Sequence, residues 1–225
     1  MRQIPLSIGP EPLATFDSFI TGANAAAVSH LRALALAPGA PVYLWGPSGS
    51  GKTHLLRALS AALRQRGAHA GWLDATTATA PRFDESSSLL VIDACEALDE
   101  AQQRAAFALF VAAVGQGAQV AAAGNVPPVD LPLREDLRTR LGWGHVFALQ
   151  PLGESDARTA LRREADRRGI FLSDEVMGYL LTRFSRDLRH LMALLERLDE
   201  FALSEQRGVT VPLLRKMFED SGALS

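Results

Sequence analysis

The most informative segment of this 225-residue chain is Gly46-Pro47-Ser48-Gly49-Ser50-Gly51-Lys52-Thr53. It satisfies the pattern Gly-x-x-x-x-Gly-Lys-Ser/Thr in full, after an apolar run at 42–45 and before a helical pattern at 52–66. A strand that leads through a glycine-rich loop into a helix is the context in which such a loop binds phosphate. Converging backbone N–H groups and the helix N-terminus favour an anion there. The segment therefore predicts a nucleotide site.

Further polar residues belong to this predicted site. In a loop of this pattern Lys52 contacts the β- and γ-phosphates and Thr53 ligates Mg²⁺. Lys52 is one of only two lysines among 23 basic residues, and His54 follows on the same helix. Asp93 ends the apolar run 89–92, where a carboxylate can hold the Mg²⁺ water shell. We expect these residues to bind nucleotide and, for Thr53 and Asp93, the metal.

The residue after Asp93 is Ala94, where P-loop ATPases of this type usually carry a second acidic residue that polarises the attacking water. Its absence predicts weak intrinsic hydrolysis. Glu96 can in principle point the same way along an extended chain, although a solvated turn glutamate is the simpler expectation. Cys95 between them is expected to be a small apolar filler.

The rest of the chain up to residue 151 alternates apolar runs with helical patterns. Continuous apolar runs are typical of strands that are buried on both faces of a parallel sheet. The expected strands are 42–45, 70–73, 89–92, 118–123 and 146–149, and the expected helices are 24–36, 52–66, 98–114 and 133–141. This alternation predicts an α/β fold with a parallel sheet.

The pattern changes after Pro151, where only amphipathic helices follow. They are expected at 154–168, 173–184, 186–205 and 210–219. Prolines at the start of the chain favour an extended tail. We therefore predict a tail at 1–12, an α/β domain at 13–151 and a small all-helical domain at 152–225.

Composition excludes several classes of protein. The formal net charge is −2, with 23 basic and 25 acidic residues, so a free-standing binder of nucleic-acid backbone is disfavoured. Cys95 is the only cysteine, which excludes an intramolecular disulfide and a cysteine-based zinc site. No signal-peptide core or run of about 18 apolar residues occurs. We expect a cytoplasmic protein with no membrane partner.

Three more polar residues are candidates for the site. Asn125 follows the run 118–123, where its side chain would face the γ-phosphate or, equally, cap a loop. Arg140 ends a short predicted helix and Arg186 opens a C-terminal one. Arg186 could reach a nucleotide between the domains. For each arginine, a solvated surface position is the alternative.

Taken in order, these motifs resemble AAA+ ATPases of the DnaA replication-initiator clade. The resemblance rests on the P-loop, the Asp93 strand, Asn125, and the segments Phe16-Asp17-Ser18-Phe19, Arg138-Thr139-Arg140-Leu141-Gly142-Trp143-Gly144 and Arg186-Asp187-Leu188. It covers essentially residues 13–225 and implies a AAA+ core with a helical lid. It also implies bound ADP or ATP with Mg²⁺, Arg140 as an arginine finger acting in trans, and Arg186 as a sensor of nucleotide.

The first residues resemble a sliding-clamp binding peptide of the form Gln-x-x-Leu-x-aliphatic. Gln3 would supply amide hydrogen bonds, and Leu6 and Ile8 would fill an apolar cleft. Initiators carry a further DNA-binding domain, whereas this sequence ends directly after the expected lid. Within the clade, the chain is thus most similar to the Hda family of regulatory proteins.

That resemblance implies regulatory inactivation of the initiator. The nucleotide-bound protein would dock on the DNA-loaded β clamp, contact DnaA and stimulate hydrolysis of DnaA-bound ATP, with DNA reached only through the clamp. A homo-oligomer is possible for a AAA+ module. The alternatives are a self-sufficient ATPase such as a helicase loader, which Ala94 disfavours, and a DNA-binding initiator, which the neutral charge disfavours.

Overall fold

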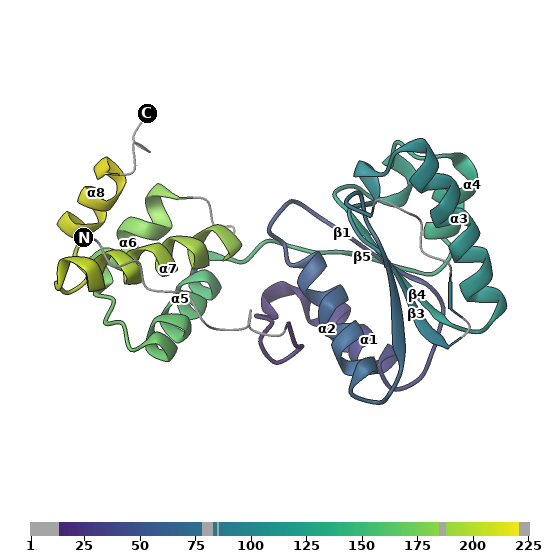
Figure 1. The fold of residues 1–225 in the computed structure, drawn as a ribbon, viewed down its shortest axis with the longest axis horizontal. Coiled ribbons are helices and arrows are strands. Elements are labelled where there is room, and N and C mark those ends of the chain that lie inside the picture. Colours follow the sequence, from purple (N-terminus) through teal and green to yellow (C-terminus); the bar gives the residue numbers. More distant parts are fainter. Residues whose placement is uncertain (1–13, 78–82, 85, 185–187, 221–225) are drawn as a thin grey trace. The chain divides into compact units, whose positions relative to one another are not determined.

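The computed structural model describes residues 14–77, 83–84, 86–184 and 188–220 (Figure 1). The chain divides into two compact units after Pro151. The first unit contains a five-stranded, all-parallel sheet in the order β2-β3-β4-β1-β5. Its strands are β1 (Val42–Trp45), β2 (His69–Leu73), β3 (Ser87–Ile92), β4 (Gln119–Gly124) and β5 (His145–Ala148).

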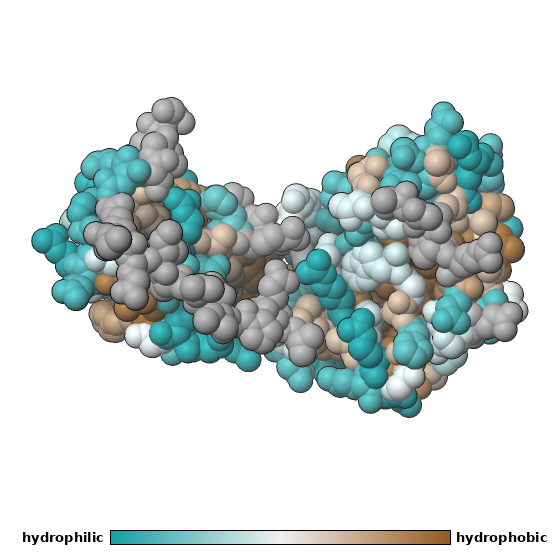
Figure 2. Space-filling model, viewed as in Figure 1, coloured by the Kyte–Doolittle hydropathy of each residue, from teal (hydrophilic) through white to brown (hydrophobic). Residues whose placement is uncertain are grey.

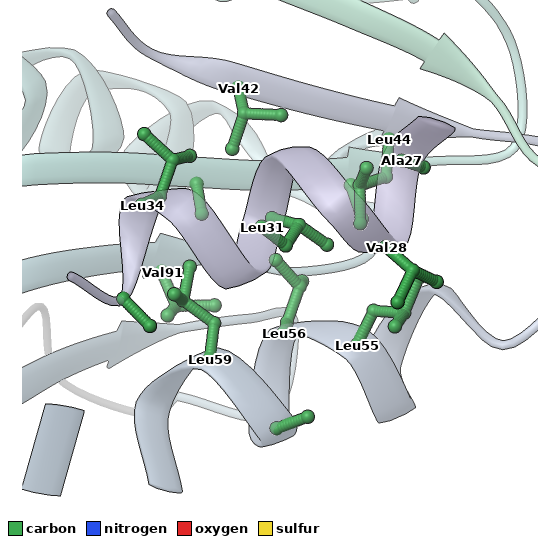
Figure 3. Packing of buried hydrophobic residues seen from close by; sticks show 14 of the residues in the cluster. Ala27, Val28, Leu31, Leu34, Val42, Leu44, Leu55, Leu56, Leu59 and Val91 are labelled. Carbon is green, nitrogen blue, oxygen red and sulfur yellow. The ribbon is translucent and has the colours of Figure 1, made fainter. Parts of the chain in front are cut away.

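Helices cover both faces of this sheet. They are α1 (Ala25–Leu34), α2 (Lys52–Arg64), α3 (Glu100–Gly115) and α4 (Glu135–Leu141), with the 3-10 turns η1 (Gly22–Asn24), η2 (Cys95–Ala97) and η3 (Pro128–Asp130). Successive strand residues face opposite layers: Leu44 packs with α1 and α2, and Tyr43 packs with α3 and α4. Figure 3 shows Leu31 of α1 close to Leu56 and Leu59 of α2 in the first layer. Because both faces are buried, the strands need the continuous apolar runs seen in the sequence.

The second unit is all-helical. It contains α5 (Glu154–Arg168), α6 (Asp174–Arg183), α7 (Leu188–Glu205) and α8 (Val211–Asp220) around one apolar core. The α5 helix ends at Gly169, whose φ of +70° suits a residue without a side chain. The α6 helix begins after Ser173, whose hydroxyl accepts a hydrogen bond from the N–H of Val176 at 3.3 Å.

The predicted elements are confirmed, with small shifts at their ends. The α3 helix begins at Glu100, not at 98, because Asp99 forms a capping box with Gln102. The Asp99 carboxylate accepts from the N–H of Gln102 at 2.8 Å, and the Gln102 side chain accepts from the N–H of Asp99 at 3.0 Å. Asp99 therefore stands outside the helix as its cap.

The surface mixes polar and apolar residues, as Figure 2 shows for one face. The large apolar side chains that remain exposed are those of Leu36, Val111, Val114, Val129, Trp143, Val146, Phe171 and Leu203. Among the described helices, none is long and apolar enough to cross a membrane.

Candidate functional site

The loop between β1 and α2 lies at the carboxyl edge of the parallel sheet. Its conformation requires glycine, because Gly49 and Gly51 have φ angles of +78° and +93°. A side chain at Gly46 would overlap the carbonyl oxygen of Leu149, and one at Gly51 would contact the Phe19 ring. The loop is thus packed tightly against its surroundings before it opens the 13-residue α2 helix.

Two polar side chains of this loop fit a phosphate ligand. The Lys52 ammonium group donates to the carbonyl oxygens of Gly46 (2.7 Å) and Pro47 (2.9 Å), so it is held over the loop. The Ser50 hydroxyl is buried and has no hydrogen-bond partner within the part of the chain that the structure describes. A buried hydroxyl without a partner is costly, and a phosphate oxygen would satisfy it. The loop, the ammonium group and the helix N-terminus could together bind an anion.

The metal-binding residues predicted from sequence also meet at this edge. The Thr53 hydroxyl donates to an Asp93 carboxylate oxygen at 2.7 Å, although 40 residues separate them. Asp93 is buried, and its other carboxylate oxygen accepts from the N–H of Ala94 at 2.9 Å. A hydroxyl and a carboxylate oxygen side by side suit Mg²⁺, which prefers oxygen ligands and retains several waters.

The turn after β3 contains Glu96, as expected, and adds a contact that was not expected. Glu96 is partly exposed, and its carboxylate accepts a hydrogen bond from the backbone N–H of Asn125 at 3.1 Å. Asn125 directly follows β4, so it lies at the same edge of the sheet as the P-loop, as predicted. Cys95 is buried as expected, and its burial raises the pKa of the thiol.

His54 follows Thr53 on α2 and contacts the segment that precedes the sheet. Its Nε2 donates to the carbonyl oxygen of Thr15 at 3.0 Å and lies 3.2 Å from the Ser18 hydroxyl. Its ring also contacts Phe19, with 5.6 Å between centroids. The His54 side chain therefore ties residues 15–19 to the P-loop helix.

Arg140 lies on α4, away from the P-loop motif in sequence. Its guanidinium group stacks between two aromatic rings, 5.0 Å from the Phe107 centroid and 4.7 Å from the Trp143 centroid. Trp143 is 62% exposed, and both rings line an open depression of about 690 Å³ on the surface of the first unit. The rings hold the guanidinium through cation–π contacts that sequence reasoning did not anticipate.

Several predicted site residues lie outside the described residues. These are Gln3, Leu6 and Ile8 in the tail and Arg186 in the helical unit. Among the described residues, no group of three or more His, Cys, Asp or Glu side chains could hold a metal ion by itself. The Mg²⁺ expected at Thr53 and Asp93 would thus need the phosphates and water as further ligands.

Sequence comparison gives two family matches. Residues 11–79 match the family described as the bacterial DnaA ATPase domain, and residues 154–218 match the Hda lid domain. The fold is that of a DnaA-like AAA+ module with a helical lid. The two matches fall on different units, one on the core and one on the lid.

Solved structures support the same fold. Domain III of the Thermotoga maritima replication initiation protein DnaA has a TM-score of 0.82 and 21% identity, covering 94% of this chain and 98% of that one. A replication initiator DnaA bound to AMPPCP and single-stranded DNA has a TM-score of 0.74 and 22% identity, covering 93% and 70%. AMPPCP-bound DnaA from Aquifex aeolicus has a TM-score of 0.70 and 22% identity, covering 83% and 65%.

Proposed function

We propose that this chain is a regulatory inactivator of DnaA, which stimulates hydrolysis of the initiator's ATP and so prevents re-initiation of replication. The observation that carries the proposal is the match of the lid to the Hda family beside a DnaA-like core. A regulator built on the initiator's own fold can contact the initiator as one AAA+ module contacts another. The shared architecture supports this role.

The nucleotide serves as a structural ligand in this proposal. ADP or ATP, with Mg²⁺, would lie on the P-loop, where Lys52 and the buried Ser50 hydroxyl supply donors. Thr53 and Asp93 would hold the metal, and Asn125 and Arg186 would contact the nucleotide. Ala94 supports a nucleotide that is bound and not hydrolysed by this chain, because alanine provides no carboxylate to polarise the attacking water.

Arg140 would act in the partner's site, not in its own. Its position beside the exposed Trp143 ring, at an open depression, supports this role, since a partner can reach a guanidinium group on an open surface. An arginine that enters the site of another nucleotide-binding protein stabilises the charge of the transition state, an effect of about 10³–10⁵ in rate in other systems. Trp143 would then contact the partner beside it.

The tail would bring the protein to DNA. Gln3, Leu6 and Ile8 would bind the sliding clamp as an extended peptide, and the clamp would supply the contact with DNA. This arrangement is consistent with a chain whose formal net charge is only −2. Direct binding to duplex DNA that weakens steeply with salt would contradict this part of the proposal.

A matched pair of arginine variants tests the proposal. In a reaction with DnaA–ATP and clamp-loaded DNA, Arg140→Ala should abolish stimulated phosphate release while leaving nucleotide and clamp binding unchanged. Arg138→Ala is the control, because a residue two positions away projects from a different face of the helix. If Arg140→Ala stimulates phosphate release from DnaA–ATP as fully as the wild type, Arg140 is not an arginine finger. Robust ATP turnover by the isolated chain would favour a self-sufficient ATPase.

A further inference from the structure

The turn that carries Asn125 is held from two sides. On one side, its backbone N–H donates to the Glu96 carboxylate at 3.1 Å. On the other side, the Tyr43 hydroxyl of β1 donates to the carbonyl oxygen of Val126 at 2.9 Å. Tyr43 belongs to β1, which neighbours β4 in the sheet, and Glu96 belongs to the η2 turn that follows β3, the other neighbour of β4.

Gly124 makes this grip possible. A side chain there would overlap the Tyr43 hydroxyl, and its Cβ would lie 3.0 Å from the Glu96 carboxylate oxygen. Tyr43 is completely buried, so its hydroxyl cannot simply move aside. Burial also raises the pKa of Tyr43, which keeps its hydroxyl protonated as a donor. The small residue thus allows both side chains to approach the turn.

Glu96 reaches this position through an unusual backbone turn. Ala94 has a φ of +50°, a left-handed conformation that is uncommon for a residue with a side chain. The Asp93 carboxylate accepts from the N–H of Ala94 at 2.9 Å and so supports the turn. After it, the short η2 helix contacts β4, which brings Glu96 beside Asn125. The same aspartate that binds Thr53 therefore also supports the turn that leads to Glu96.

We propose that Glu96 is a positioning residue that fixes Asn125 relative to Asp93, and so couples the two sides of the phosphate end of the site. This role rests on the proposed nucleotide site. It differs from general-base catalysis, because it depends on the hydrogen bond that one Glu96 carboxylate oxygen accepts from the backbone N–H of Asn125 and not on activation of a water. Asn125 would then contact a terminal phosphate of the nucleotide only while its backbone N–H is hydrogen-bonded to Glu96.

The first test needs no nucleotide. In Glu96→Ala, the backbone amide of Asn125 should exchange with solvent at least about tenfold faster than in the wild type, the loss expected for a hydrogen bond to a charged group. Residue-resolved hydrogen exchange by NMR measures this rate. Glu96→Gln should restore protection, because its amide oxygen can accept the same hydrogen bond. Unchanged exchange in Glu96→Ala would overturn the proposal, even if the protein binds nucleotide as expected.

The second test uses Mg-ATP and Mg-ADP with the full chain in calorimetry. Glu96→Ala should weaken ATP binding by about tenfold more than ADP binding, and Glu96→Gln should rescue it. In an Asn125→Ala background, Glu96→Ala should add no further loss of ATP affinity. If Glu96→Gln binds ATP as weakly as Glu96→Ala, the charge of Glu96 matters and not its hydrogen bond. If the losses of ATP affinity from Glu96→Ala and Asn125→Ala add fully in the double variant, the two residues act independently. Either result would overturn the positioning role. Failure of the wild type to bind either nucleotide would instead overturn the proposed function.

Discussion

Single residues at the P-loop have a geometry that fits a phosphate ligand. Lys52 is buried at the first position of α2 and bonded to two loop carbonyl oxygens. A buried ammonium group needs such partners, because isolated burial of its charge would be costly. An anion on the loop would lie within reach of this charge, which is why we expect Lys52 to contribute to nucleotide binding.

Substitution of Lys52 gives the corresponding prediction. Lys52→Ala should weaken ADP binding by about ten- to a hundredfold, the range expected for loss of charge-assisted hydrogen bonds. Isothermal calorimetry measures the affinity. Lys216→Ala is a suitable control, because Lys216 is the chain's other lysine and pairs with Glu205 in the helical unit. Equal ADP affinity for wild type and Lys52→Ala would contradict the assignment.

Sequence reasoning could place Lys52, Thr53 and Asp93 together because each follows from local pattern. A P-loop motif positions its own residues, and the carboxyl ends of parallel strands meet at one edge. The grip on Asn125 could not be predicted in this way. Glu96 and Tyr43 are far from Asn125 in sequence, and their contacts depend on the neighbours of β4 in the sheet. An acidic residue just after a buried strand was the only available signal.

At the scale of elements, α1 and the edge strand β5 meet through aromatic rings. The ring of His30 lies 4.2 Å from that of His145 and 5.2 Å from that of Phe147, between centroids. The Nε2 of His30 is buried and has no hydrogen-bond partner among the described residues. Burial and the nearby His145 lower the pKa of His30. This contact therefore favours neutral His30.

The stability of this contact should depend on pH. Because the pKa of His30 is lower in the folded state, the unfolded chain binds more protons once the pH falls below about 6.5. Stability should therefore be fully present above that pH and decrease as the pH falls towards the folded pKa. His30→Phe should reduce the drop in melting temperature between pH 7.5 and 5.5, measured by circular dichroism. His69→Phe is the exposed control, and an unchanged drop in His30→Phe would contradict this account.

Element types were predicted correctly because hydrophobic patterning is strong in this chain. The ends of the elements depend on single polar contacts instead, as the Asp99 cap of α3 illustrates. The position of Arg140 between two rings likewise depends on the tertiary packing of α4 against α3, since Phe107 belongs to α3 and Trp143 follows α4. The sequence pattern predicts the elements that these contacts join, but it does not predict how the elements pack against one another.

At the scale of the whole molecule, the near-neutral charge bears on how the protein would reach DNA under the proposed function. The sequence has 23 basic and 25 acidic residues, so it offers little net attraction to a phosphate backbone. A protein that acts near replicating DNA with such a balance needs another route. The proposed clamp-binding tail supplies one, and it requires only a short extended peptide.

The tail gives a prediction that is independent of nucleotide. The double variant Gln3→Ala, Leu6→Ala should lose binding to immobilised sliding clamp, because it removes both the amide and one apolar anchor. Affinity for ADP should stay unchanged. Arg2→Ala serves as the control, since it lies outside the motif. Clamp binding that is equal in wild type and double variant would refute the assignment of the tail.

The most direct test of the central claim is single-turnover hydrolysis of ATP bound to DnaA. DnaA is loaded with labelled ATP and mixed with clamp-loaded DNA, with or without this protein, and release of labelled phosphate is followed over time. We predict strong acceleration by the protein, together with slow turnover when the protein alone is given ATP. An unchanged rate of hydrolysis on DnaA, while the protein alone turns over ATP rapidly, would contradict the account.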